Sequence, residues 1–236
     1  MKTAALLVAA GRGTRAGEGL PKQWRPLAGR RVFDWSYAAF SQRADIDHIL
    51  VVIHPDDEGY LPKGVEAVHG GATRTASVRA GLEALEARGV THVLIHDGAR
   101  PLVSGDVITG VVNALEGGAV AAAPALPVSD ALWRGEGGRV TGTQNREGLY
   151  RAQTPQGFHY KKILAAHHDH PGGAADEEMR RVGGGEVDFN DVSEAILSQG
   201  HPEAKLRTFP ARPEIRCFHK IPVLIQLGYI NGDVAL

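Results

Sequence analysis

Near its start the chain carries an uninterrupted apolar run, Ala4 to Ala10, which gives way at once to the glycine-rich, basic segment Gly11 to Gln23. A run that is apolar at every position has no polar face, which is typical of a strand buried on both sides in a parallel sheet. The run has seven residues, whereas a membrane-spanning helix needs about 20. The sequence therefore predicts a central strand with a loop over its carboxyl end.

Strand and helix patterns alternate along the first two thirds of the chain. Further strands are expected at Asp47–Ile53, Val65–Val68, Thr91–Ile95 and Gly118–Ala123, and helices at Val32–Ser41, Thr73–Ala87 and Asp106–Leu115. Thr73 can cap its helix, on which Val78, Leu82 and Leu85 would form one apolar stripe. This alternation predicts an α/β fold, a doubly wound, mostly parallel sheet that binds ligands at the carboxyl ends of its strands.

Residues 126–146 interrupt the alternation. The segments Val128–Arg134 and Arg139–Thr143, joined by the glycine-rich turn 135–138, predict a β-hairpin. Such an insertion is either an arm that reaches a partner subunit or an edge hairpin of its own domain. Helical patterns return at His159–Asp169 and Val192–Gln199. We expect one domain over residues 1–236, with 126–146 as a β-arm.

Composition excludes several classes of protein. Hydrophobic residues make up 43% and charged residues 22% of the chain, which is typical of a globular protein. The formal net charge of −1 does not suit nonspecific binding to nucleic acid, which needs a basic surface. Cys217 is the single cysteine, so an internal disulfide is excluded. We expect a cytoplasmic protein with no nucleic-acid or membrane partner.

The glycine-rich segment matches the dinucleotide-binding pattern G-x-G-x-x-G/A at Gly11 to Ala16. In that motif a helix opens directly and the next strand follows within about 20 residues. Here the expected strand begins some 36 residues after Gly11, and four residues oppose a helix: Gly17, Gly19, Pro21 and Pro26. We expect instead an extended loop that wraps a triphosphate with backbone amides and the cations Arg12, Arg15 and Lys22. The alternative is a solvated loop with ordinary surface cations.

Four blocks in order resemble one enzyme family. They are Leu7-Val8-Ala9-Ala10-Gly11-x-Gly13-x-Arg15 with Pro21-Lys22-Gln23, Gly70-Gly71-x-x-Arg74-x-x-Ser77-Val78, His96-Asp97-x-Ala99-Arg100-Pro101, and Arg146-x-x-Leu149 with Thr154-Pro155-Gln156. The pattern is similar to nucleotidyltransferases with a Rossmann-like fold of the nucleotide-diphospho-sugar transferase type. Within these it resembles the 2-C-methyl-D-erythritol 4-phosphate cytidylyltransferases. The resemblance implies transfer of a cytidylyl group from CTP to that polyol phosphate, with release of pyrophosphate, in non-mevalonate isoprenoid biosynthesis.

The resemblance also implies roles for individual residues. The catalytic set is Arg15, Lys22 and Asp97, with Asp97 as the ligand of Mg²⁺. The CTP set is Ala9, Ala10, Gly11, Gly13, Gly70, Gly71, Arg74 and Ser77, and the acceptor set is Arg146, Thr154 and Lys220. It further implies a homodimer joined by the hairpin arm. Two simpler interpretations stay open, a turn-capping role for Asp97 and a surface ion pair for Arg74.

The last third departs from the family pattern. Asn190 stands where the family usually carries Thr, before Asp191, and the Thr and Asp that the family shows after the position of Lys220 are absent. The departures lie on the acceptor side rather than the CTP side. Two alternatives therefore stay open, a cytidylyltransferase for another polyol phosphate such as ribitol 5-phosphate, and a non-catalytic module that binds CTP.

Overall fold

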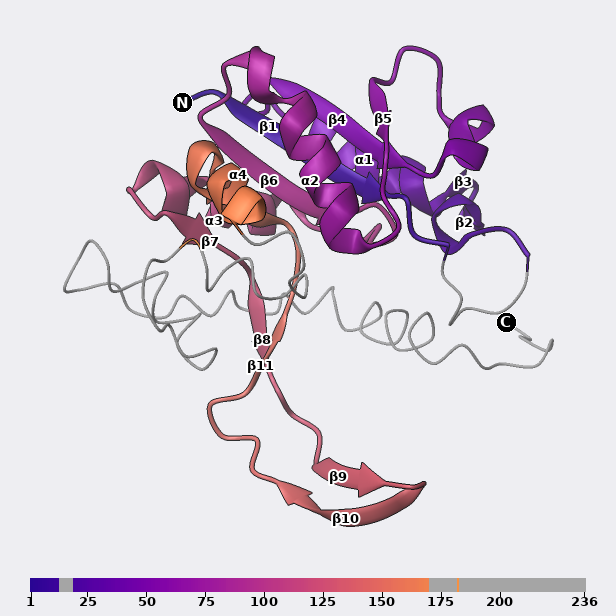
Figure 1. Cartoon of the computed structure of the whole chain (residues 1–236), viewed down its shortest axis with the longest axis vertical. Coiled ribbons are helices and arrows are strands. Elements are labelled where there is room, and N and C mark those ends of the chain that lie inside the picture. The colour runs from indigo at the N-terminus through magenta and orange to yellow at the C-terminus, as the bar shows by residue number, and fades with distance from the viewer. Residues whose placement is uncertain (13–18, 170–181, 183–236) are drawn as a thin grey trace.

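The computed structural model of the chain describes residues 1–12, 19–169 and 182 and is built around a six-stranded sheet (Figure 1). The strand order is β5-β4-β1-β6-β12-β7. Its strands are β1 (Thr3–Ala9), β4 (His48–Ile53), β5 (Ala67–His69), β6 (His92–Asp97), β7 (Ala121–Ala122) and β12 (Gln156–His159). Strands β5, β4, β1 and β6 are parallel, whereas β12 runs antiparallel to β6 and β7. The predicted mostly parallel sheet is confirmed.

Strand β1 lies inside the sheet, paired with β4 on one side and β6 on the other. Leu6 faces one hydrophobic core and Leu7 the other, and both side chains are fully buried. Successive side chains of a strand point to opposite faces. Alternate residues of β1 therefore pack into two different hydrophobic cores, one on each face of the sheet. This explains why the run at the start of the sequence is apolar at every position.

In the described part of the chain, helices cover both faces of the sheet, as expected for a doubly wound fold (Figure 1). Helices α2 (Arg74–Ala84) and α4 (Tyr160–Asp169) pack on one face, and α1 (Val32–Ser41) and α3 (Gly105–Glu116) pack on the other. The Oγ1 atom of Thr73 accepts a hydrogen bond from the backbone N–H of Ala76 at 3.1 Å, which confirms the predicted cap. Helix α2 ends earlier than predicted because the chain tightens into the 3-10 turn η4 (Glu86–Arg88).

Strand β12 was not predicted. Its sequence, Gln156-Gly157-Phe158-His159, contains no apolar run. Phe158 fills the core beneath α2 and α4, while Gly157 lets α3 approach the opposite face. A Cβ atom on Gly157 would lie 2.5 Å from Cγ1 of Val111. The strand is thus specified by packing between distant segments rather than by a local pattern.

The inserted hairpin forms an arm that projects away from the sheet (Figure 1). A short ladder between β8 (Ala125–Pro127) and β11 (Tyr150–Ala152) forms its stalk, and β9 (Leu132–Glu136) pairs with β10 (Arg139–Gln144) at its end. The turn is shorter than predicted, since Gly137 and Gly138 alone join the strands, with φ values of 56° and 78°. Positive φ at both central residues is the geometry that favours glycine in tight hairpins.

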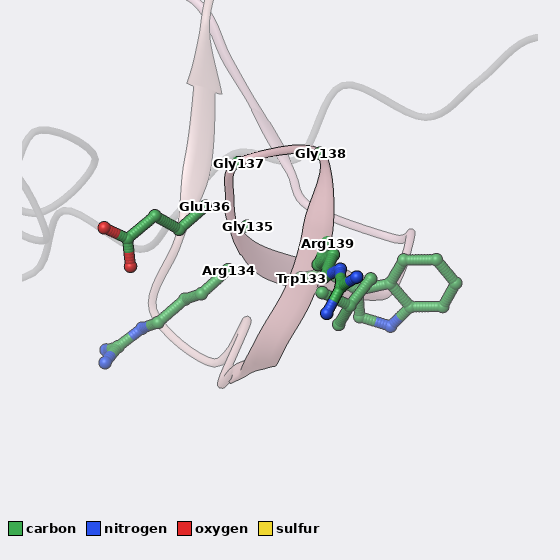
Figure 2. Close-up of a pocket in the computed structure, with 8 residues that line it drawn as sticks. Trp133, Arg134, Gly135, Glu136, Gly137, Gly138 and Arg139 are labelled. Atoms are coloured by element: carbon green, nitrogen blue, oxygen red, sulfur yellow. The ribbon is translucent and has the colours of Figure 1, made fainter.

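The arm exposes apolar side chains. Trp133 is 69% exposed and Val140 is 59% exposed. Figure 2 shows the shallow hollow lined by residues 133–140, with Arg134 and Glu136 pointing to one side of the hairpin and Trp133 to the other. Trp133 therefore lies outside the core of its own chain.

Short elements complete the described chain. They are η2 (Lys22–Trp24), the strand pair β2 (Pro26–Leu27) and β3 (Arg30–Arg31), and η3 (Pro55–Tyr60). The helix expected at Val192–Gln199 lies outside the described residues. Among the residues described, no helix has the length and apolar character needed to cross a membrane.

Candidate active site at the carboxyl edge of the sheet

Several of the predicted site residues lie where the parallel strands end. Strand β1 leads into Ala10 and Gly11, β5 leads into Gly70, and β6 ends at Asp97. Strand β12 runs in the opposite direction, so Thr154, which lies just before it, reaches the same edge. In open α/β sheets this edge is where ligands bind.

The Gly70-Gly71 segment packs too closely against its neighbours to carry side chains. A Cβ atom on Gly70 would lie 2.5 Å from Cβ of Ala10 and 2.6 Å from Oγ of Ser77. The hydroxyl of Ser77 donates to the carbonyl of Thr73 at 2.9 Å and accepts from the N–H of Gly71 at 3.1 Å. Ser77 is 3% exposed. Ser77 therefore supports the backbone of the Gly70-Gly71 segment through hydrogen bonds. A direct contact between Ser77 and CTP stays a prediction.

Lys22 lies beside the end of β1, in the short turn η2, and its side chain remains accessible to solvent. The next residue, Gln23, is buried, and its Nε2 atom donates to the carbonyls of Ala9 at 2.7 Å and Gly11 at 3.1 Å. The side-chain amide of Gln23 therefore connects η2 to the predicted CTP-binding residues Ala9 and Gly11, at the opposite end of the glycine-rich loop. Gly13 and Arg15 lie outside the described residues.

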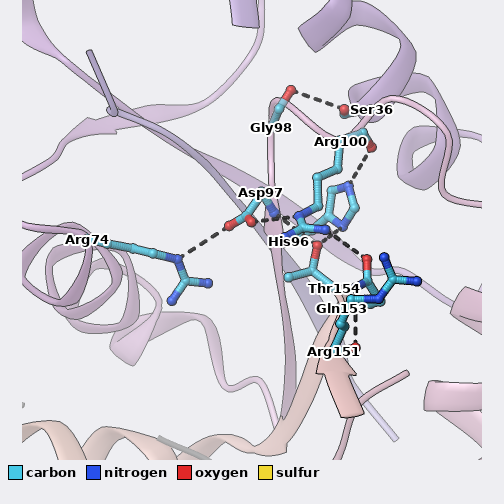
Figure 3. A network of polar contacts seen from close by, with 9 residues as sticks. All are labelled: Ser36, Arg74, His96, Asp97, Gly98, Arg100, Arg151, Gln153 and Thr154. Atoms are coloured by element: carbon cyan, nitrogen blue, oxygen red, sulfur yellow. Dashed lines mark hydrogen bonds and ion pairs between the residues drawn. The ribbon is translucent and has the colours of Figure 1, made fainter. Parts of the chain in front are cut away.

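Asp97 is held between two arginines (Figure 3). Its Oδ1 atom lies 3.3 Å from Nε of Arg74, and its Oδ2 atom lies 2.9 Å from Nε of Arg100. Burial alone raises the pKa of Asp97, but the positive charges of Arg74 and Arg100 outweigh burial and bring the pKa below its ordinary value. The carboxylate is therefore ionised at neutral pH. Arg74 forms an ion pair with Asp97 at the sheet edge, and its contact with CTP stays a prediction.

His96 anchors Thr154 beneath Asp97 (Figure 3). Burial lowers the pKa of His96 to about 4, so the ring is neutral at pH 7. The Nε2 atom lies 3.1 Å from the carbonyl of Arg100, to which it must donate, and Nδ1 therefore accepts from the hydroxyl of Thr154 at 2.9 Å. The same hydroxyl accepts from the N–H of Asp97 at 3.4 Å. The hydroxyl proton of Thr154 is thus donated to His96. Thr154 could donate a hydrogen bond to a phosphate only if its hydrogen bond to His96 were broken.

A neutral, buried His96 predicts a loss of stability in acid. The unfolded chain binds a proton on this ring near its ordinary pKa of about 6.5, whereas the folded protein does so only near 4. Lowering the pH through this window therefore favours unfolding, by about 3 kcal/mol for this group alone. Urea unfolding between pH 7 and pH 4 measures the change. A His96 ring signal that titrates near its ordinary pKa in NMR spectra would contradict the assignment.

The two described residues of the predicted acceptor set lie in different parts of the chain. Arg146 lies in the arm, between β10 and β11, and donates to the carbonyl of Ser129. Thr154 lies at the sheet edge, 8% exposed, and Lys220 is outside the described residues. Next to Thr154, the Oε1 atom of Gln153 accepts from Arg100 at 2.8 Å. Arg100 thus links Asp97 to the segment that precedes β12.

One buried carboxylate beside the glycine-rich loop was not predicted. Asp57 accepts from Nη1 of Arg12 at 2.7 Å and from Nε1 of Trp24 at 2.9 Å. Arg12, expected on a triphosphate, is therefore paired with protein carboxylates, since its Nη2 also lies 3.3 Å from Asp56. Asp56 and Asp57 follow β4 and belong to η3. Nothing in the sequence indicates that this turn meets the glycine-rich loop.

Asp97 suits magnesium only in combination with a substrate. Mg²⁺ is commonly held by one or two carboxylates together with phosphate oxygens and water. The described part of the chain contains no group of three or more His, Cys, Asp or Glu residues arranged to hold a metal. The ionised carboxylate of Asp97 fits the first requirement, and the phosphates of a nucleotide would supply the rest. Arg74 and Arg100 already contact its oxygens, so a bound ion would share the carboxylate with them.

Known proteins match this chain over most of its length. The family model for 2-C-methyl-D-erythritol 4-phosphate cytidylyltransferase, IspD, matches residues 3–191. A protein of that name from Cereibacter sphaeroides is 58% identical over 210 residues, covering 86% of this chain and 93% of its own. A bifunctional IspD/IspF enzyme from Rhodobacter capsulatus is 61% identical over 189 residues, covering 78% of this chain and 49% of that longer protein.

Solved structures agree with the sequence comparisons. The 2-C-methyl-D-erythritol 4-phosphate cytidylyltransferase from Thermus thermophilus is 30% identical with a TM-score of 0.59, covering 98% of this chain and 100% of that one. The 4-diphosphocytidyl-2C-methyl-D-erythritol synthase from Anaerococcus prevotii is 28% identical with a TM-score of 0.62, covering 76% of this chain and 81% of that one. The motifs, the doubly wound fold and these relatives lead to one conclusion: the chain belongs to the 2-C-methyl-D-erythritol 4-phosphate cytidylyltransferase family.

Proposed function

We propose that the chain transfers a cytidylyl group from CTP to 2-C-methyl-D-erythritol 4-phosphate, giving 4-diphosphocytidyl-2-C-methyl-D-erythritol and pyrophosphate. The reaction serves non-mevalonate isoprenoid precursor biosynthesis. The observation that carries the proposal is a cationic sheet edge, with Arg74 and Arg100 on Asp97 and Lys22 in the turn beside the end of β1, in a chain 58% identical to a cytidylyltransferase of this name. Such a site suits an enzyme that handles two phosphate-bearing substrates.

The chemistry requires little from the protein beyond positioning and charge. A phosphate oxygen of the acceptor forms a bond to the α-phosphorus of CTP, and the bond from that phosphorus to pyrophosphate breaks. Negative charge grows on the α-phosphate oxygens and on the leaving group in the transition state. Lys22 and Arg15 are proposed to stabilise the α-phosphate, while the Gly70-Gly71 segment and Ala10 are proposed to accept the nucleoside. Gly70 packs directly against Ala10, so these two proposed nucleoside contacts lie next to each other at the sheet edge.

Magnesium is part of the proposal, with Asp97 as its protein ligand. The ion would neutralise phosphate charge during transfer. Burial by itself raises the pKa of Asp97, but the charges of Arg74 and Arg100 lower it by more, so the pKa lies below its ordinary value. This lowered pKa supports the role because only the ionised carboxylate attracts the metal.

The acceptor is tested with a substrate panel. We expect pyrophosphate release from CTP to be fastest with 2-C-methyl-D-erythritol 4-phosphate. Equal kcat/KM with ribitol 5-phosphate would favour the alternative polyol phosphate. Calorimetric binding of CTP without turnover on any acceptor would favour the non-catalytic module.

The arm is proposed to join two chains in a homodimer. Its exposed Trp133 and Val140 support an interface, and Arg146 lies in the arm rather than at the sheet edge of its own chain. We expect light scattering at micromolar concentration to give the mass of two chains, and Trp133→Ala to shift the mass toward one chain. Leu102→Ala, which removes an exposed apolar side chain outside the arm, is the control and should leave the mass unchanged. A wild-type mass of one chain would contradict the dimer.

The location of the enzyme is proposed to be the cytoplasm, without nucleic-acid or membrane partners. The single cysteine and the net charge of −1 support this proposal. Fractionation of cells that express the tagged full chain tests it, and recovery in the membrane fraction would contradict it.

A further inference from the structure

Asp57 holds both ends of the glycine-rich loop. Arg12 stands at the start of the loop and Trp24 follows its end, and each donates to a different oxygen of the same carboxylate, at 2.7 Å and 2.9 Å. Asp57 is 2% exposed, so neither bond competes with bulk water at the carboxylate. A buried carboxylate that loses its partners is strongly unfavourable, which makes this arrangement rigid.

The segment that carries Asp57 also holds the ring of Trp24. Tyr60, from the same element η3, stacks on Trp24 with ring centroids 5.5 Å apart, and Phe33 packs on it at 5.0 Å. Trp24 is 1% exposed and belongs to the core beneath α1 and α3. The ring therefore has one orientation, with its N–H directed at Asp57.

These contacts fix the backbone on which Lys22 stands. The N–H of Trp24 donates to the carbonyl of Pro21 at 2.9 Å and closes the η2 turn around Lys22. On the same turn, Gln23 donates to the carbonyls of Ala9 and Gly11. The backbone of Lys22 is thus held at both neighbouring positions, while its ammonium group stays accessible to solvent.

We propose that Asp57 is a positioning residue for cytidylyl transfer, acting through Trp24 and Arg12 to set the place of Lys22. The proposal rests on the proposed function of the site. Asp57 would not touch a substrate, because its two oxygens are occupied by the protein. A displacement of about 1 Å in a group that stabilises the transition state can lower the rate about 10²-fold.

Asp57→Asn tests the proposal with almost no change in side-chain volume. The amide cannot accept from both Arg12 and Trp24, because one of its two polar atoms is itself a donor. We expect kcat to fall about 10- to 100-fold with the KM for CTP changed less than about threefold, since the loss falls on the transition state. The matched control is Asp45→Asn, which breaks the ion pair of Asp45 with Arg43 on the connection between α1 and β4. It should leave kcat within about threefold of wild type.

A double-mutant cycle separates positioning from a general loss of structure. In a Lys22→Ala background, Asp57→Asn should lower kcat by less than about threefold more, because the group it positions is already gone. An equal fall of kcat in both backgrounds would overturn the proposal, and so would an Asp57→Asn enzyme with wild-type kcat.

Hydrogen exchange supplies a readout that does not need activity. Asp57→Asn should speed amide exchange in the peptide over residues 21–25, whereas Asp45→Asn should not. Unchanged exchange in that peptide would also overturn the proposal. If wild-type protein releases no pyrophosphate with the acceptor, the proposed function fails instead, and the exchange measurement still decides whether Asp57 holds the turn of Lys22.

Discussion

Lys22→Ala is expected to lower kcat about 10²- to 10³-fold, the range seen when one donor to a transition-state oxyanion is removed. The ammonium group is a mobile point charge on a solvent-accessible side chain, while its backbone is fixed by Gln23 and Trp24. This combination lets Lys22 follow the α-phosphate as charge grows on it. The KM for CTP should change much less than kcat, because the contact strengthens in the transition state. Steady-state pyrophosphate release measures both constants.

Lys63→Ala provides the control for charge alone. Lys63 is exposed and precedes β5, outside the site. Its removal changes the net charge by the same amount and should leave kcat unchanged. A Lys22→Ala enzyme with kcat within about threefold of wild type would show that Lys22 has no part in the transition state.

Asp97→Asn is expected to lower kcat about 10²- to 10³-fold, as for loss of one strong electrostatic contact at the reacting phosphate. The asparagine keeps the shape of the side chain but removes the charge that would hold magnesium and that pairs with Arg74 and Arg100. The Mg²⁺ concentration needed for half of the maximal rate should rise more than about tenfold. A titration of the rate with Mg²⁺ measures this shift.

The same titration separates two roles of Asp97. If the carboxylate only orients the two arginines, kcat falls while the Mg²⁺ dependence stays as in wild type, and that outcome would contradict the metal role. Asp169→Asn, at the exposed end of α4, is the matched control and should change neither quantity.

Elements with a strong local pattern were predicted well. The helix Val32–Ser41 has the predicted bounds, and β1 ends one residue before the predicted Ala10. Both depend on the order of apolar side chains along a short segment, which the sequence displays directly. Strand β12 and the β8–β11 stalk depend on which distant segments pack or pair together, so no local pattern indicates them.

The site shows the same division. The carboxyl ends of the parallel strands were predicted to meet, and Ala10, Gly70 and Asp97 lie at that edge. The pairing of Arg12 with Asp57 and the bond between Thr154 and His96 join residues far apart in sequence. Residue types and spacing indicate which charged and polar side chains are present in the site. Only the folded chain shows which of these side chains already form hydrogen bonds or ion pairs with one another.

Pyrophosphate release from CTP and Mg²⁺, measured with and without 2-C-methyl-D-erythritol 4-phosphate, is the decisive measurement of cytidylyl transfer. We expect release that requires the acceptor in the wild-type enzyme and nearly disappears in Lys22→Ala. Binding of CTP without acceptor-dependent release in the wild-type enzyme would contradict the proposed transferase and leave a nucleotide-binding protein.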